Sequence, residues 1–240
     1  MEEIKHRGSS NTEDNYKGIP IHAAWGVHAL VADIVGANLQ KGDRVADVGA
    51  GDGALSLRLH DRGFDVIAFD FDNSTWQVAD IPCVVADVEK DIRSISDKGP
   101  YKAICAIEII EHLENPRDFL RQLVKLSKEH KSILVISTPN PLDTFSSITM
   151  FTRGIFNWFS TEHYAGGGHI SILPHWMISE HLKYLGANKF EWKFCAPYKH
   201  PSRVKGIFYN LISFIRKMAS RSGDTSYFNG QTGLVIVYPE

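Results

Sequence analysis

Short apolar runs alternate along the chain with segments of helical periodicity. The runs occupy residues 44–48, 65–70, 83–87, 101–107 and 132–137. They lack the polar alternation of a sheet with one solvated face, so we expect strands buried on both faces. Helical segments such as 54–62 and 116–130 separate them. This order predicts an α/β fold, a mostly parallel sheet with right-handed crossovers and helices on both faces.

The sequence predicts a single domain over residues 21–240, with further elements near both ends of the chain and one inserted segment. Apolar positions recur at helical spacing within 23–39 and 175–185, and the last run, GLVIVYPE, predicts a strand antiparallel to its neighbours. Residues 1–20 are polar, as in a mobile leader that can fold over a ligand. Residues 142–172 hold aromatics, glycines and histidines without a clear period, which predicts a cap inserted after the fifth strand.

Composition narrows the class of protein without naming a function. With 43% hydrophobic and 22% charged residues in 240, the chain is an ordinary globular domain with insertions. A net charge of −2 gives no overall attraction for nucleic acid. The three cysteines, Cys83, Cys105 and Cys195, are far apart, and neither a secretory signal nor a spanning segment is visible. We expect a cytoplasmic protein with reduced thiols.

A glycine-rich turn joins the first predicted strand of the sheet to a helix. Gly49, Gly51 and Gly53 permit a tight turn and let backbone N–H groups approach a ligand closely. With Ala54 at its last place, the turn also satisfies the dinucleotide pattern G-x-G-x-x-G/A. The turn alone therefore leaves an NAD-dependent oxidoreductase open.

Acids at the strand ends separate these alternatives. Asp70 ends the second strand, where a carboxylate accepts both ribose hydroxyls of NAD or S-adenosylmethionine. Asp87 ends the third strand and could accept the adenine amino protons, while Asp47 can favour a cationic amino acid moiety. Three acids suit a zwitterionic, sulfonium-bearing cofactor better than a pyrophosphate, and no Tyr-x-x-x-Lys pair supports an oxidoreductase.

Over residues 41–141 the chain resembles the class I S-adenosylmethionine-dependent methyltransferases. VADVGAGDG is similar to their first motif, VIAFDFD to the second, VVADV to the third, and IEIIEHLENP with ILVISTPNP to the fourth and fifth. The resemblance implies a Rossmann-like seven-stranded sheet and S-adenosylmethionine as cofactor. By it, the cofactor-binding residues are Asp47, Gly49, Ala50, Gly51, Gly53, Asp70, Phe71, Asp87, Val88 and Glu108.

A cluster of ionisable side chains follows the fourth strand of the predicted sheet. Glu108, Glu111 and His112 form ExxEH, and this spacing puts all three on one face if a helical turn begins there. Two carboxylates and an imidazole can hold a divalent cation such as Mg²⁺, with an open position that lowers the pKa of a substrate hydroxyl. Without a metal, the same side chains can act as a general base, or they can simply decorate a helix.

ExxEH resembles the motif of the ubiquinone-pathway O-methyltransferases and of the small-RNA 3′-terminal 2′-O-methyltransferases. In both families a later histidine can join the site; here that metal ligand and catalytic residue would be His169, with His163 as substitute. The RNA family's H-x-F-E-W signature is not matched, which disfavours an RNA 2′-O-methyltransferase. The resemblance implies O-methylation of a small molecule, a glycan or a lipid-linked intermediate; a non-catalytic cofactor-binding subunit is the remaining alternative.

Near the C-terminus the chain becomes basic and amphipathic over about residues 199–221. Residues 192–223 contain no acid, and apolar residues 208, 211, 215 and 218 fall at helical spacing. Such a segment can lie peripherally on an anionic membrane or meet a phosphate-bearing substrate. The alternative is a helix that packs its apolar side on the sheet and points its charges to water.

Overall fold

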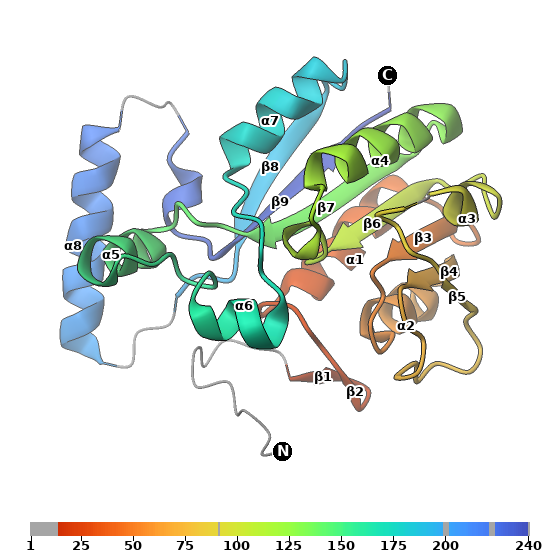
Figure 1. Ribbon diagram of the computed structural model, residues 1–240, viewed down its shortest axis with the longest axis horizontal. Coiled ribbons are helices and arrows are strands. Elements are labelled where there is room, and N and C mark those ends of the chain that lie inside the picture. Colours follow the sequence, from red (N-terminus) through yellow and green to blue (C-terminus); the bar gives the residue numbers. More distant parts are fainter. Residues whose placement is uncertain (1–13, 91, 199–201, 221–223, 240) are drawn as a thin grey trace.

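The computed structural model describes residues 14–90, 92–198, 202–220 and 224–239, and these contain a seven-stranded sheet (Figure 1). The strand order is β5-β4-β3-β6-β7-β9-β8. The strands are β3 (Arg44–Val48), β4 (Asp65–Asp70), β5 (Cys83–Val85), β6 (Ala103–Ile107), β7 (Ile133–Pro139), β8 (Phe190–Cys195) and β9 (Thr232–Val237). The strands from β5 to β7 are parallel, and β9 runs antiparallel between β7 and β8. The predicted mostly parallel α/β fold with an antiparallel last strand is confirmed.

Helices cover both faces of the sheet and bury two apolar clusters. One face packs α1 (Val27–Asn38) and α2 (Ala54–Asp61), and the other packs α4 (Pro116–His130) and α7 (His175–Tyr184), with the short α3 (Arg93–Ser96). Successive strand residues divide between the two clusters, as Val45 and Ala46 do, because side chains alternate across a strand. The central strands β3, β6, β7 and β9 are therefore covered on both sides, as their apolar runs predict.

Residues at the two ends of helix α4 determine where it begins and ends. The side chain of Asn115 accepts a hydrogen bond from the backbone N–H of Asp118, and Pro116 occupies the first helical turn. Lys131 ends the helix in the left-handed conformation. The predicted bounds, 116–130, match the structure because these end signals are local.

The sequence analysis does not predict strand β8. Its sequence FEWKFC alternates in exposure, because β8 lies at the edge of the sheet and pairs only with β9 among the described strands. An edge strand with one polar face lacks the apolar run by which the other strands are predicted.

The ordered fold begins before Ile21, so the predicted leader needs correction. Residues Asn15–Tyr16 (β1) and Ile19–Pro20 (β2) form a small hairpin, and Ile19 is buried. The Tyr16 hydroxyl donates to Asp61 Oδ2 at 2.8 Å, which fastens the hairpin to α2. Residues 1–13 of the predicted leader lie outside the described residues.

The predicted cap, 142–172, contains two helices, α5 (Thr144–Arg153) and α6 (Thr161–Gly167). Asp143 caps α5 by accepting from the backbone N–H groups of Phe145 and Ser146. Helix α5 packs beside α8 (Arg203–Ala219), at one end of the molecule (Figure 1). No helix among the described residues has both the length and the apolar character needed to cross a membrane.

The buried cap of α5 makes the stability of the protein depend on pH. Burial raises the pKa of Asp143 to about 7, so folding favours its protonated form. This contribution to stability is fully present below the unfolded pKa and is lost as pH rises through about 7. We expect Asp143→Asn, which keeps the capping acceptor, to remove that loss, on the order of 2–4 kcal/mol. Denaturant unfolding of both proteins between acid and neutral pH measures it; a stability difference that does not grow with pH contradicts the assignment.

Candidate active site

The glycine turn after β3 adopts a backbone that only glycine enters readily. Gly49, Gly51 and Gly53 have φ values of 75°, 54° and 101°. A Cβ at Gly49 would lie 2.6 Å from Ile109 Cδ1, and one at Gly53 would lie 2.7 Å from Val78 Cγ2. The backbone of the turn is thus packed closely against its neighbours, and the N–H groups of Gly49 and Ala50 both donate to the Phe69 carbonyl, which ties the turn to the end of β4.

Replacing Gly53 tests this close packing. We expect Gly53→Ala to lower the free energy of unfolding by about 2–4 kcal/mol, because strained backbone and a clash with Val78 combine. Gly42→Ala is the matched control: Gly42 has a φ of 87°, but nothing lies within 4 Å of the added Cβ, so only the strain of about 1 kcal/mol remains. Equal losses of stability in the two variants, measured by urea unfolding, would show that packing at Gly53 is unimportant.

Asp70 is bonded directly to the glycine turn. Its Oδ2 accepts from the Gly51 backbone N–H at 2.8 Å, and its Oδ1 accepts from the Asp72 N–H at 3.3 Å. Its backbone carbonyl accepts from Ala86 N–H at 2.7 Å, which holds the end of β5 beside the end of β4. The turn and the ends of two strands therefore meet at one edge of the sheet. Phe71, the next residue, is 71% exposed at this edge.

Asp87 and Val88 lie just beyond β5 with different environments. Asp87 is half-buried, and its Oδ2 lies 2.6 Å from Lys90 Nζ; this hydrogen bond lowers the pKa of Asp87 and keeps the carboxylate charged. Val88 is buried. The structure thus places a charged acid and an apolar side chain together, close to the Asp70 end of the sheet.

Asp47 lies beneath the turn and is only 1% exposed. Its Oδ2 accepts from the Ser56 hydroxyl at 2.6 Å, and burial raises its pKa to about 6. It therefore braces the strand against α2, and its role in favouring a cationic amino acid moiety stays a prediction. The sequence analysis does not predict a polar pair beside the turn: His22 Nε2 lies 3.2 Å from Asp52 Oδ2, and His22 borders Gly51. His22 is 29 residues before Gly51, so spacing gives no signal for this contact.

The ExxEH segment does not begin a helical turn at Glu108, so the prediction of one shared face is wrong. Glu108 has a φ of 51°, and the 3₁₀ turn η1 spans Ile110–His112. The Glu108 carboxylate turns to β7, where Oε1 accepts from the Ser137 hydroxyl at 2.7 Å. Glu108 accordingly lies outside the cluster that Glu111 and His112 form.

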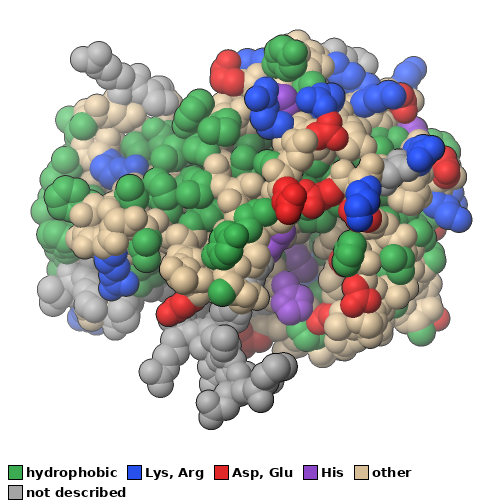
Figure 2. Space-filling model, in the orientation of Figure 1, with side chains coloured by type: hydrophobic (Ala, Val, Ile, Leu, Met, Phe, Trp, Pro, Cys, Tyr) green, Lys and Arg blue, Asp and Glu red, His purple; other side chains and the backbone are tan. Residues whose placement is uncertain are grey.

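Glu111, His112 and His169 form one cluster. Each offers a ligand atom, and these atoms lie within 4.8 Å of one another. The cluster is assembled by backbone pairing, since the N–H groups of Ile170 and Ser171 both donate to the Glu111 carbonyl, at 3.0 and 2.9 Å. The rings of His112 and His169 lie 4.8 Å apart. Figure 2 shows histidine side chains gathered near the middle of this face of the molecule.

Glu111 is the electrostatic centre of this cluster. Its side chain is 0% exposed, and neither carboxylate oxygen has a hydrogen-bond partner among the described residues. Burial is the main reason why the pKa of Glu111 is raised well above its usual range, and the charge of Glu108 raises it further. His112 Nε2 lies 4.0 Å from Glu111 Oε1. A buried carboxylate with this environment costs stability, which is typical of functional sites.

The orientation of His169 follows from one hydrogen bond. Its Nδ1 lies 2.7 Å from the Trp158 carbonyl oxygen, and since a carbonyl only accepts, Nδ1 carries the proton and Nε2 the lone pair. The alternative ligand, His163, stacks at 5.9 Å from His169 and bonds through Nδ1 to the Ser160 hydroxyl at 2.7 Å. His163 is therefore adjacent to the cluster but outside its three-residue core.

The fold is that of the S-adenosylmethionine-dependent methyltransferases. A crystal structure of such an enzyme from Archaeoglobus fulgidus is similar with a TM-score of 0.60 at 19% identity, covering 88% of this chain and 94% of that one. The plantazolicin methyltransferase BpumL, solved in complex with SAH, is similar with a TM-score of 0.54 at 13% identity, covering 89% and 82%. At these identities the likeness shows the fold.

Sequence comparison shows the family. The family described as "Methyltransferase domain" matches residues 26–202, and the chain belongs to it. A protein of Rickettsia bellii called ubiquinone biosynthesis O-methyltransferase is 32% identical over 101 residues, covering 40% of this chain and 42% of that one. A protein of the same name from Xanthomonas oryzae pv. oryzae is 32% identical over 117 residues, covering 45% and 48%. The chain thus matches less than half the length of these curated relatives.

Proposed function

We propose that this methyltransferase moves the methyl group of S-adenosylmethionine to a hydroxyl oxygen of a small molecule, a glycan or a lipid-linked intermediate. The oxygen attacks the methyl carbon in line, the bond from carbon to sulfur breaks, and adenosylhomocysteine leaves. The hydroxyl proton passes to a base in the protein. Most of the catalysis is then the positioning of two reactants and the removal of one proton.

The observation that supports this proposal is the contact between the glycine turn and Ile109, the residue just before the turn that holds Glu111 and His112. Gly49 packs directly under Ile109, and Ile109 immediately precedes the 3₁₀ turn that holds Glu111 and His112. Asp70 fixes the same glycine turn through Gly51. A nucleoside held by Asp70, with Asp87 and Val88 at its adenine, would thus present its methionine end near the side chains that can accept a proton.

The cluster can supply the base without any other group. His169 has its Nε2 lone pair oriented by the Trp158 carbonyl, and His112 lies beside it. Glu111 Oε1 lies 4.0 Å from His112 Nε2 and can supply the counter-charge when a ring takes up a hydroxyl proton, because an adjacent imidazolium favours the ionised form of the carboxyl. We infer that one of these two imidazoles accepts the proton and that Glu111 orients and stabilises it.

The same residues fit a divalent cation. Glu111, His112 and His169 would be its ligands. The buried carboxylate of Glu111, which has no hydrogen-bond partner among the described residues, would then gain a partner in the ion. When bound, a cation such as Mg²⁺ or a transition metal would supply positive charge that lowers the pKa of a nearby hydroxyl. Two imidazoles and one carboxylate favour a transition metal over Mg²⁺.

Product analysis tests the transfer to oxygen. The protein is incubated with S-adenosylmethionine and phenolic, sugar and lipid-linked hydroxyl acceptors, before and after chelation, and the position of the methyl group is determined by NMR. We expect an O-methyl product and adenosylhomocysteine in equal amounts. A methyl group on nitrogen, sulfur or carbon would overturn the assignment to oxygen. Saturable cofactor binding with no turnover of any acceptor would instead favour a non-catalytic cofactor-binding subunit.

A further inference from the structure

Helix α8 turns its apolar side away from the protein. Ile207, Leu211, Phe214 and Met218 follow one another at helical spacing, flanked by Phe208 and Ile215, and all six are between 52% and 73% exposed. The alternative expected from sequence, that this helix packs its apolar side on the sheet and points its charges to water, is wrong. In the structure the apolar side is the solvent side.

The polar side of α8 anchors it in this orientation. Arg216 Nη2 donates to the Leu142 carbonyl at 2.9 Å and Nη1 donates to the Thr144 hydroxyl at 3.2 Å. Its guanidinium also lies 4.2 Å from the ring centroid of Phe228. The Ser213 hydroxyl donates to Asn229 Oδ1 at 2.8 Å. Rotating the apolar side inward would break all of these contacts, so its exposure is built into the fold.

Helix α5 extends the exposed apolar area. It packs against α8, and its Phe151 and Met150 are 92% and 44% exposed. We call this area, made by the two helices, the α5–α8 surface; Figure 2 shows hydrophobic side chains spread over that end of the molecule. A continuous exposed apolar area of this kind marks a site of interaction.

The α5–α8 surface carries only positive charge along its two helical segments. Residues 144–161 and 192–223 contain no Asp or Glu. Arg153, Arg203 and Lys217 are exposed there. Lys199 and Arg221, also in the basic segment predicted from sequence, lie outside the described residues. A two-fold dimer through this surface would bring like charges together without acids to pair them.

We propose that the α5–α8 surface docks the protein peripherally on a bilayer that contains anionic lipid. An exposed ridge of large apolar side chains bordered by cations matches an interfacial helix, whose apolar side enters the boundary between headgroups and acyl chains. Each nearby cation adds attraction to an anionic surface. The proposal does not depend on the acceptor in the proposed function.

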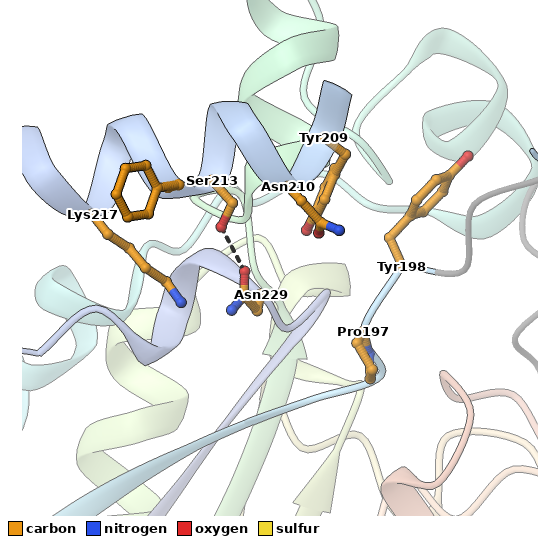
Figure 3. A pocket seen from close by; sticks show the side chains of 8 residues that line it. Pro197, Tyr198, Tyr209, Asn210, Ser213, Lys217 and Asn229 are labelled. Atoms are coloured by element: carbon orange, nitrogen blue, oxygen red, sulfur yellow. Dashed lines mark hydrogen bonds between the residues drawn. The ribbon is translucent and has the colours of Figure 1, made fainter. Parts of the chain in front are cut away.

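A cavity beside this surface gives a lipid headgroup a place to bind. It has a volume of about 380 Å³ and lies between α8, the residues after β8 and the loop before β9. Figure 3 shows Lys217, Ser213 and Asn210 on the α8 side of the cavity, opposite Asn229 and Tyr198. Phe214 belongs both to the cavity wall and to the apolar ridge. A phosphate could therefore meet Lys217 while its acyl chains follow the ridge.

Vesicle flotation of the full chain tests the proposal. The probes are vesicles of phosphatidylcholine with and without phosphatidylglycerol. We expect binding to the anionic vesicles only, weakened by about 0.5 M salt because screening removes the attraction of the cations. Leu211→Ser combined with Phe214→Ser should lower the affinity at least about tenfold, because both side chains lose their apolar burial. Lys217→Glu should lower it further.

Tyr184→Ser is the matched control, since Tyr184 is 78% exposed on α7, outside the α5–α8 surface. Binding of S-adenosylmethionine, measured on each variant, verifies that the fold is intact and separates this proposal from the catalytic one. Absence of wild-type binding to anionic vesicles, or equal weakening by Tyr184→Ser and the double variant, overturns it. If the wild type does not bind vesicles and the double variant differs from it in solution mass, the surface binds a protein partner instead.

Discussion

Asp70→Asn is expected to weaken the binding of S-adenosylmethionine by about 100-fold. The carboxylate accepts from the Gly51 N–H and, by our proposal, from ribose hydroxyls, and charged hydrogen bonds of this kind contribute about 1.5–3 kcal/mol each. An amide can replace only part of this set, because one of its two positions is a donor. Calorimetric titration of the variant measures the loss.

Asp72→Asn is the matched control for this experiment. Asp72 lies two residues further along, and its carboxylate accepts from the backbone and hydroxyl of its neighbour Ser74. Its replacement should leave cofactor affinity within about twofold of wild type, because the hydrogen bonds of its carboxylate among the described residues go to Ser74 and not to the glycine turn. If the two variants bind S-adenosylmethionine equally well, Asp70 does not hold the cofactor.

Glu111→Gln is expected to lower the rate of methyl transfer by about 100-fold or more while cofactor affinity stays near that of wild type. The amide keeps the shape of the side chain but cannot ionise to pair with an imidazolium or to bind a cation. It should also raise the free energy of unfolding, because the native carboxylate is fully buried without a hydrogen-bond partner among the described residues. Higher stability with lower activity is the expected pair of results.

Glu114→Gln, an exposed residue three positions further along, is the control. It should change neither rate nor stability appreciably. Metal analysis of the wild type and of Glu111→Gln, together with rates after chelation, separates the two roles of the cluster. If Glu111→Gln loses both a bound ion and activity, Glu111 acts as a metal ligand. If activity is lost and neither protein contains an ion, Glu111 acts with the catalytic base. Unchanged activity in Glu111→Gln would remove Glu111 from the catalytic site altogether.

The sheet is predictable from sequence because most of its strands are buried on both faces. The runs AICAI and ILVI are apolar at every position, and the end signals of α4 lie within its own sequence. Strand β8 escapes prediction because Glu191 and Lys193 occupy its exposed side. Amphipathicity predicts α8 but not its direction, since the contacts of Arg216 with Leu142 and Thr144 are distant in sequence.

The site is less predictable than the fold, for similar reasons. Gly49, Gly51 and Gly53 can be predicted, because their backbone conformation demands glycine. The separation of Glu108 from Glu111 cannot be predicted. It depends on the left-handed backbone of Glu108, whereas the spacing of the motif suggests a helical turn. Nor can the place of His169 be derived from the residues alone, since backbone pairing across almost sixty residues sets it.

The central claim is that the glycine turn, with Asp70 and Asp87 beside it, binds a sulfonium nucleoside. Calorimetric titration of the wild-type protein with S-adenosylmethionine and, separately, with NAD tests it most directly. We expect saturable binding of one S-adenosylmethionine per chain and no heat of binding with NAD. Saturable binding of NAD, with no response to S-adenosylmethionine, would contradict the claim.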